Sequence, residues 1–176
     1  DSGTSWNQIS KWSNNNNLGG LSIPMVHADQ HIMVFDPSDS NKALFGNDGG
    51  VYYGSNLSNA ASNNNAIETR NKNYNTLQFY KGAIGSEISN EKLLAGAQDN
   101  GSQFINSASS GINSSLEVSG GDGAYCFIDK DNEYMITSYV YNNYYYLNYS
   151  TGNYIYRIAD DSEDGDFINP AELNSV

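Results

Sequence analysis

A glycine–aspartate turn that follows a short apolar run occurs three times in the sequence, and it constrains the fold more than any other feature. The copies lie at Ala43–Tyr52, Leu93–Ser102 and Val118–Tyr125. A short strand, a tight Asp-Gly or Asn-Gly turn and a second short strand form a β-hairpin. Because the hairpin recurs along one chain, we expect repeated small sheets, arranged radially or in a stack.

The composition agrees with an all-β fold. Of the 176 residues, 38% are hydrophobic and only 16% are charged, so most of the polarity comes from Asn, Ser, Gly and Tyr. Asn and Gly favour turns, and Tyr favours strands. The pattern predicts strands at 25–35, 42–47, 50–55, 77–84, 92–97, 102–106, 115–119, 123–128, 134–140, 143–148 and 154–158. It predicts loops at 14–17, 58–75 and 107–114, and no long helix.

The net charge of −12 limits the classes of partner. A polyanion such as DNA or RNA would be repelled, and so would an anionic membrane surface. Neutral glycans, cationic ligands and Ca²⁺ remain compatible with this charge. No apolar run is long enough to cross a membrane as a helix.

The chain contains one cysteine, Cys126, so no intrachain disulfide supports the fold. Its apolar and aromatic neighbours indicate a buried thiol on a strand. The sequence starts at Asp1 without an initiator methionine, which indicates a processed or partial chain.

A second motif is the polar turn Asp1–Trp6 (DSGTSW), in which we expect Trp6 to anchor the following strand in the core. Weaker echoes of this turn start at Asn56, Ser109 and Ser150. Successive starts are therefore 55, 53 and 41 residues apart, which fits the blades of a β-propeller.

Together these segments resemble the Asp-box (BNR-type) propellers, a group that includes sialidases, sortilins and xyloglucanase-like enzymes. The residues that carry the resemblance are Asp1–Trp6, Val26–His31, Phe35–Pro37, Gly46–Tyr52, Gln78–Tyr80, Gly96–Gly101 and Gly120–Gly123. The branch they resemble most is the sortilin-like propeller proteins of Bacteroidota, many of which are cargo of the type IX secretion system. The resemblance covers roughly residues 1–170.

The resemblance implies a partial propeller of four-stranded antiparallel blades, with about three to four blades present and about seven in the parent protein. The expected boundaries are a partial blade at 1–24, blades at 25–76, 77–114 and 115–159, and a connection at 160–176. The resemblance further implies an extracellular or outer-surface location in a Gram-negative bacterium. The implied partners are the remaining blades, the secretion machinery and a glycan or protein ligand.

Blade topology would bring several polar side chains to one face. In a four-stranded meander, Gly-Asp turns between strands two and three lie on the face where the innermost strand begins. The Asp-box turns, between strands three and four, lie on the opposite face. The ligand-binding candidates on the first face are His27, Asp29, His31, Asp48, Gln98, Asp99, Asn100 and Asp122.

The segment His27–His31 (HADQH) is the densest polar cluster, and on a strand residues 27, 29 and 31 would point the same way. It admits three interpretations: a hydrogen-bonded network that fixes the inner strand, a ligand contact, or a metal site. The zincin pattern is not present, because Ala28 stands where that motif has glutamate. We expect no metal centre from this set.

The turn aspartates Asp48, Asp99 and Asp122 are open to three roles: turn formation, substrate contact, or the acid and base of a glycosidase. The xyloglucanase-like catalytic motif is not reproduced residue for residue, so no catalytic residue is assigned. Gln98 and Asn100 are less easily explained by turn geometry, and their amides suit glycan hydroxyls.

Three further segments have alternative interpretations. Asp129–Glu133 is a connecting turn or a Ca²⁺ loop, and the acidic run Asp160–Asp166 resembles a calcium loop only loosely. The tyrosine run Tyr139–Tyr149 either packs between blades or offers rings to a sugar or a protein. Apart from this Ca²⁺ alternative, no cofactor is expected.

The leading prediction is a blade segment of a secreted or surface propeller that recognises a glycan or protein through one face. The alternatives are a xyloglucanase-like glycoside hydrolase and a structural spacer in an exported adhesin-like protein. The sequence favours binding over catalysis.

Overall fold

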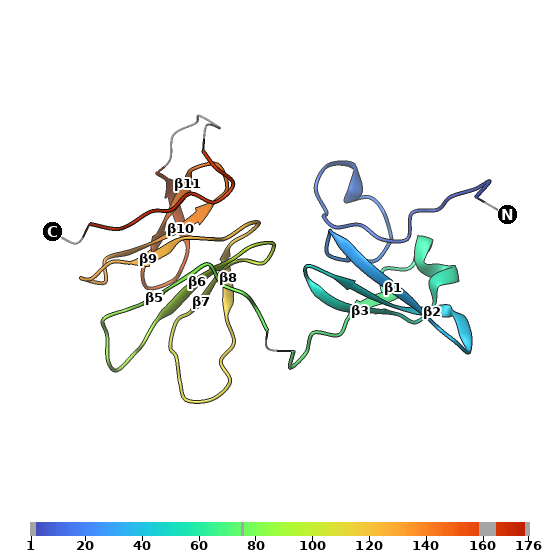
Figure 1. Cartoon of the computed structure of the whole chain (residues 1–176), viewed down its shortest axis with the longest axis horizontal. Coiled ribbons are helices and arrows are strands. Elements are labelled where there is room, and N and C mark those ends of the chain that lie inside the picture. The colour runs from blue at the N-terminus through green and yellow to red at the C-terminus, as the bar shows by residue number, and fades with distance from the viewer. Residues whose placement is uncertain (1–2, 75, 159–164, 175–176) are drawn as a thin grey trace. The chain divides into compact units, whose positions relative to one another are not determined.

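The computed structural model describes residues 3–74, 76–158 and 165–174. Within these ranges the chain forms twelve strands, arranged in three four-stranded antiparallel sheets. Each sheet is a meander in which neighbours in sequence are neighbours in space (Figure 1). This confirms the expected all-β fold of partial propeller-like blades, and none of the three described sheets is closed into a ring.

The chain divides into two compact units, Asp1–Thr76 and Leu77–Val176. The described residues of the first unit form one sheet and two short 3₁₀ helices. Its elements are η1 (Asn16–Leu18), β1 (Gln30–Asp36), β2 (Asp39–Asn47), β3 (Gly50–Gly54), η2 (Leu57–Ser62) and β4 (Ile67–Thr69).

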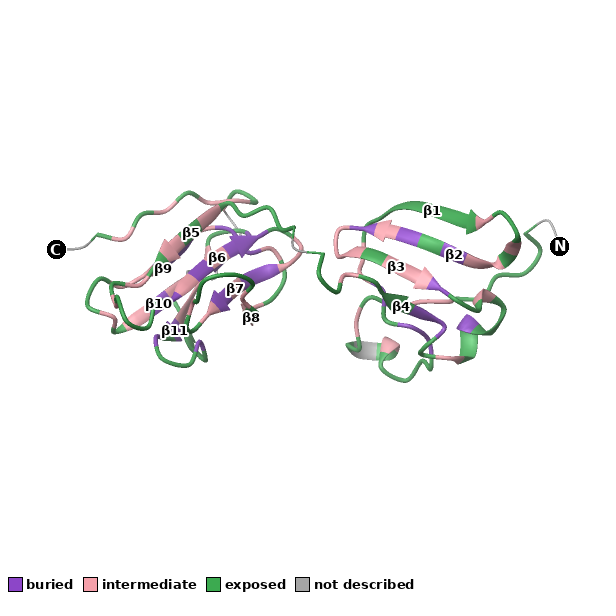
Figure 2. Cartoon of the chain, turned by 90° about the horizontal axis from the view of Figure 1, so that it is seen from below, coloured by how far each residue is buried: buried purple, intermediate pink, exposed green. Residues whose placement is uncertain are grey.

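The core of the first unit lies on one face of its sheet. Ala43 and Phe45 alternate with more exposed residues along β2, and they pack with Val26, Ala60, Ala66 and Ile67. Burial of these apolar side chains is the main stabilising contribution to such a small sheet. By contrast, β1 is exposed along nearly its whole length (Figure 2).

The second unit contains two sheets that pack against each other. The first consists of β5 (Lys81–Ile84), β6 (Leu93–Ala97), β7 (Gly101–Ile105) and β8 (Leu116–Ser119). The second consists of β9 (Cys126–Ile128), β10 (Tyr134–Tyr139), β11 (Asn143–Asn148) and β12 (Tyr154–Arg157). The shared core contains Leu94, Phe104, Cys126, Met135, Leu147 and Tyr149.

Most strands lie where the sequence predicts them, although those predicted at 77–84 and 123–128 are shorter and begin at Lys81 and Cys126. Two further predictions differ more. The strand expected at 25–35 begins only at Gln30, because Asp29 has a positive φ of 57° that interrupts the extended backbone. Residues 27, 29 and 31 therefore do not lie on one strand, and that expectation is wrong. The expected loop at 58–75 contains η2 and the short strand β4, which pairs with β3.

The turn motifs also divide into two kinds. Asn47–Gly50 joins β2 to β3 and Gln98–Gly101 joins β6 to β7, so both connect strands two and three of a sheet, as expected. The third motif, Gly120–Gly123, instead leads from β8 into β9 and connects two sheets. Since β8 pairs with β7, the blade boundary expected between 114 and 115 is displaced to this connector.

The weaker echoes of the Asp1–Trp6 turn occupy equivalent positions. Those at Asn56, Ser109 and Ser150 lie between strands three and four of the three described sheets, as the topology predicts. In the Asp1–Trp6 motif, residues 1 and 2 lie outside the described ranges. Trp6 is 88% exposed and donates from Nε1 to the Gly3 carbonyl at 3.1 Å, so the expectation that it anchors the core is wrong.

Within the described residues, no helix is both long and apolar enough to span a membrane.

Candidate functional site

In the first unit, asparagine side chains shape the turn that carries Asp48. Asn47 Oδ1 accepts a bond from the Gly49 amide at 3.0 Å, which closes a local Asx turn. Asn71 donates from Nδ2 to the Gly49 carbonyl at 2.6 Å and accepts from the Val51 amide at 2.8 Å. The turn is therefore fixed from both sides of its backbone.

The segment before β1 packs against this turn. A Cβ atom built on Gly49 would lie 2.4 Å from the His27 Cβ, so only glycine allows the histidine to approach this closely. Gln30 donates from its amide to the His27 carbonyl and accepts from Asn47 Nδ2 at 3.3 Å. Thus His27 and Gln30 are tied to the β2–β3 turn.

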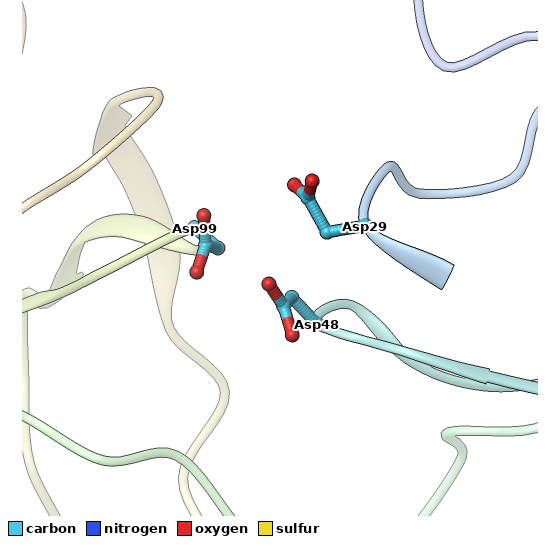
Figure 3. A group of neighbouring side chains, drawn as sticks. All are labelled: Asp29, Asp48 and Asp99. Carbon is cyan, nitrogen blue, oxygen red and sulfur yellow. The ribbon is translucent and has the colours of Figure 1, made fainter. Parts of the chain in front are cut away.

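This packing brings three predicted residues together. His31 Nε2 pairs with Asp48 Oδ1, although the His31 side chain remains 64% exposed. Asp29 and Asp48 have carboxylate oxygens within 4.8 Å of each other, and Figure 3 shows the two side chains projecting from their separate loops. The arrangement can orient an imidazole or present two carboxylates to a hydroxylated ligand.

In the second unit, two segments far apart in sequence interlock through their backbones. Gly101 donates to the Gly121 carbonyl at 2.8 Å, and Gly123 donates to the Ala97 carbonyl at 3.0 Å. The Asp99 amide donates to Asp122 Oδ1 at 3.2 Å. These bonds fix the β6–β7 turn against the connector that leads into β9.

Glycine makes this close approach possible. A Cβ on Gly96 would lie 2.2 Å from the Ala124 carbonyl oxygen, and one on Gly123 would lie 2.5 Å from the Gly101 carbonyl oxygen. Both distances are well below van der Waals contact with backbone atoms that cannot turn aside. Gly96 of the second motif and Gly123 of the third are therefore required by contact between these two segments.

Polar and aromatic side chains project from the interlocked segments. Exposed Tyr80, which immediately precedes β5, donates its hydroxyl to Gln98 Oε1 at 2.7 Å. Asn100 Nδ2 donates to the Gln98 carbonyl at 3.2 Å, and Gln103 donates to the Asn100 carbonyl at 2.6 Å. We call the side chains of Tyr80, Gln98, Asn100 and Asp122 the turn face.

Tyr139 lies beside the turn face. A Cβ on Gly121 would lie 2.5 Å from Cε2 of its ring, which places the ring directly over the connector. Partial burial raises the pKa of Tyr139 above its ordinary value, and the nearby Asp122 carboxylate raises it further. The phenol is therefore neutral and a hydrogen-bond donor at physiological pH.

The structure thus assembles the eight predicted residues as two groups, one in each unit. His27, Asp29, His31 and Asp48 gather in the first, and Gln98, Asp99, Asn100 and Asp122 in the second. Sequence reasoning did not predict Asn71 or Tyr80 as site residues, and it considered Tyr139 only as part of the tyrosine run Tyr139–Tyr149. For Tyr80, the available signal was its position within the strand predicted at 77–84 and within the segment Gln78–Tyr80 that carries the family resemblance.

The Asp129–Glu133 segment is a connecting turn between β9 and β10. Asp129 Oδ2 accepts the amides of Asp131 at 3.0 Å and Glu133 at 3.3 Å, and Asn132 has a φ of 62°. Asp129 therefore uses this oxygen to cap its own loop. Of the second Ca²⁺ candidate, Asp160–Asp164 lie outside the described residues.

The tyrosine run contributes to packing between the two sheets of the second unit. Tyr149 belongs to the buried core, and Tyr145 packs against it. Tyr144 donates its hydroxyl to the Asn169 carbonyl at 3.1 Å, and the Tyr141 ring meets Phe167 edge-on. The C-terminal segment therefore packs against the start of β11.

No protein-family model matches this sequence, and no curated protein matches it either.

Proposed function

We propose that this chain is a recognition segment of a secreted or cell-surface Asp-box propeller protein, and that it binds a neutral glycan through the turn face of the second unit. The turn-face arrangement carries the proposal, since fixed backbones present an amide pair, a carboxylate and an exposed tyrosine side by side. Amides and carboxylates bind sugar hydroxyls in pairs, and an aromatic ring accepts the apolar face of a sugar.

The charge of the chain supports a neutral ligand over an acidic one. The net charge is −12, and Asp122 adds local negative potential at the turn face. An anionic polysaccharide would be repelled, whereas hydroxyl groups can donate to the Asp122 carboxylate. The three echoes of the Asp box at equivalent positions support membership of an exported propeller protein.

The test is a neutral glycan array followed by calorimetry on the full chain and on Gln98→Ala. Loss of the Gln98 amide should weaken binding about tenfold, since a hydrogen bond in a site is worth about 1–1.5 kcal/mol. Gln8→Ala is the matched control, because this exposed glutamine lies in the first unit and bonds only locally to the Ser10 carbonyl at 2.9 Å. Glycan binding with equal affinity in both variants would refute the turn face as the site, and protein capture without glycan binding would refute the ligand class.

A second candidate function is glycoside hydrolysis. It is favoured by the Asp29–Asp48 pair, whose oxygens lie within 4.8 Å, close to the carboxyl separation of about 5–5.5 Å in retaining enzymes. Incubation of the full chain with neutral polysaccharides should then release reducing ends, and Asp29→Asn should abolish the release.

A further inference from the structure

A groove opens between the two sheets of the second unit, and its lining contains none of the four turn-face residues. It lies between β8 and the strands β11 and β12, and it encloses about 270 Å³. Its lining consists of Val118, Ser119, Gly120, Tyr145, Leu147 and Tyr154. This volume is just below the lower end, about 300 Å³, of small-molecule pockets, so the groove accepts one small ring.

Two tyrosine rings form a corner of this groove. The centroids of Tyr145 and Tyr154 are 6.0 Å apart, and their planes meet at 70°. Tyr154 is 59% exposed, whereas Leu147, its cross-strand partner on β11, is fully buried. The groove therefore combines an apolar floor with an aromatic face that is open to solvent.

The opposite wall combines the apolar side chain of Val118 with the hydroxyl of Ser119 and the backbone of Gly120. Ser119 donates its hydroxyl to Thr137 Oγ1 at 3.0 Å, which leaves the lone pairs of the Ser119 oxygen available as acceptors. Gly120 has no side chain to fill the space, so its backbone forms part of the lining. A ligand here meets tyrosine rings on one side, and on the other side Val118 together with the hydrogen-bonding oxygen of Ser119.

We propose that this groove, which we call the rim groove, binds a single neutral pyranose residue. A pyranose has an apolar face of C–H groups that stacks on a tyrosine ring, and a border of hydroxyls that can donate to Ser119. The charge of −12 disfavours an anionic sugar, and the volume disfavours a longer ligand. The inference relies on the proposed function only for the class of ligand, since none of the lining residues belongs to the turn face.

The same sheet supplies a matched contrast. Tyr134, Tyr146 and Tyr156 form a continuous stack, with ring centroids 4.8 and 4.7 Å apart and planes inclined by 23° and 10°. Stacked rings cover each other's faces and leave mainly their edges exposed. Tyr156 is 49% exposed and lies on β12 like Tyr154, but it is absent from the groove lining.

The experiment is saturation-transfer difference NMR on the full chain with methyl pyranosides of glucose, galactose, mannose and N-acetylglucosamine. The variants are Tyr154→Ala, Tyr154→Phe and Tyr156→Ala, each checked for folding by circular dichroism. We expect at least one methyl pyranoside to bind, with transfer strongest at the C–H groups of one ring face. Tyr154→Ala should weaken this binding about tenfold or more, whereas Tyr154→Phe and Tyr156→Ala should retain it.

Gln98→Ala separates the two proposals. If it abolishes pyranoside binding while Tyr154→Ala does not, the turn face binds sugar and the rim groove proposal is refuted. If no methyl pyranoside binds, the rim groove proposal is likewise refuted, and the array of larger glycans decides the turn face separately. If Tyr154→Ala and Tyr156→Ala weaken pyranoside binding equally, the effect is a general one on the sheet, and the proposal is overturned.

Discussion

Cys126 is enclosed between the two sheets of the second unit. Its thiol lies 3.3 Å from the carbonyl oxygens of Lys81 and Leu94, to either of which it can donate. Burial raises the pKa of Cys126 to about 12, because the thiolate would lose its hydration. The residue therefore acts as a small hydrophobic side chain in the core.

We expect Cys126 to be unreactive in the native chain. At pH 8, a pKa of about 12 in place of 9.0 lowers the thiolate fraction by about a thousandfold. Titration with a disulfide reagent such as DTNB should show no rapid reaction in buffer and one thiol per chain in urea. Rapid labelling in buffer would contradict the enclosed position.

The raised pKa of Cys126 also determines how the stability of the chain changes with pH. Between about pH 9 and 12 the unfolded chain loses the thiol proton while the folded chain retains it, so the stability from this group is complete below pH 9 and declines above it. In urea titrations above pH 9, the free energy of unfolding should therefore fall more steeply with pH for the native chain than for Cys126→Ala.

At the scale of elements, backbone hydrogen bonds join the β6–β7 turn to the connector that leads into β9. Backbone bonds join them at Gly101–Gly121 and Ala97–Gly123. Since two sheets meet here, the close packing of Gly96 on Ala124 couples the folding of both.

Gly96→Ala should therefore destabilise the second unit by about 2 kcal/mol or more, as expected for overpacking against backbone. Gly82→Ala is the matched control on the neighbouring strand, because a Cβ there would meet only the Leu94 carbonyl oxygen at an ordinary 3.8 Å. Chemical denaturation of both variants by urea, followed by circular dichroism, provides the measurement. Similar midpoints for the two would show that the close approach is not required.

The sequence predicted the elements whose signals are local. β2, β3, β6 and β7 were found because apolar runs flank an Asp-Gly or Asn-Gly turn. β4 was missed because Ile67–Thr69 is short and follows an Asn-rich stretch, and its strand character comes from pairing with β3. The role of Gly120–Gly123 was missed because a Gly-Asp-Gly turn does not specify which strands it joins.

The candidate site was predictable to the same extent. Asp48 and Asp99 lie on strand-two-to-three turns, as topology requires. β1 starts at Gln30 because Asp29 has a positive φ. Asn71 and Tyr80 join the site through contacts with residues that are distant in sequence. No local sequence pattern indicates either feature.

At the scale of the whole molecule, charge dominates. The chain has twenty acidic and eight basic residues, so its excess negative charges repel one another in the folded state at neutral pH. Stability should therefore rise when salt screens this repulsion.

Raising NaCl from 10 to 500 mM at pH 7 should raise the melting temperature by a few degrees, which corresponds to about 1 kcal/mol. Differential scanning calorimetry measures the shift. Near pH 4.2, where the sequence is close to its isoelectric point, the same salt increase should have little effect. A melting temperature at pH 7 that does not depend on NaCl would contradict this account.

The interlocked turns also determine where the second unit can change in length over evolution. An insertion at Gln98–Gly101 would separate amide and carbonyl groups that hold two sheets together. The loop between β7 and β8 is largely exposed, and Asn113 closes it on itself through bonds to Ser109. We therefore expect added residues to be tolerated in the β7–β8 loop and not in the β6–β7 turn, so a tag or foreign peptide is best inserted in this loop.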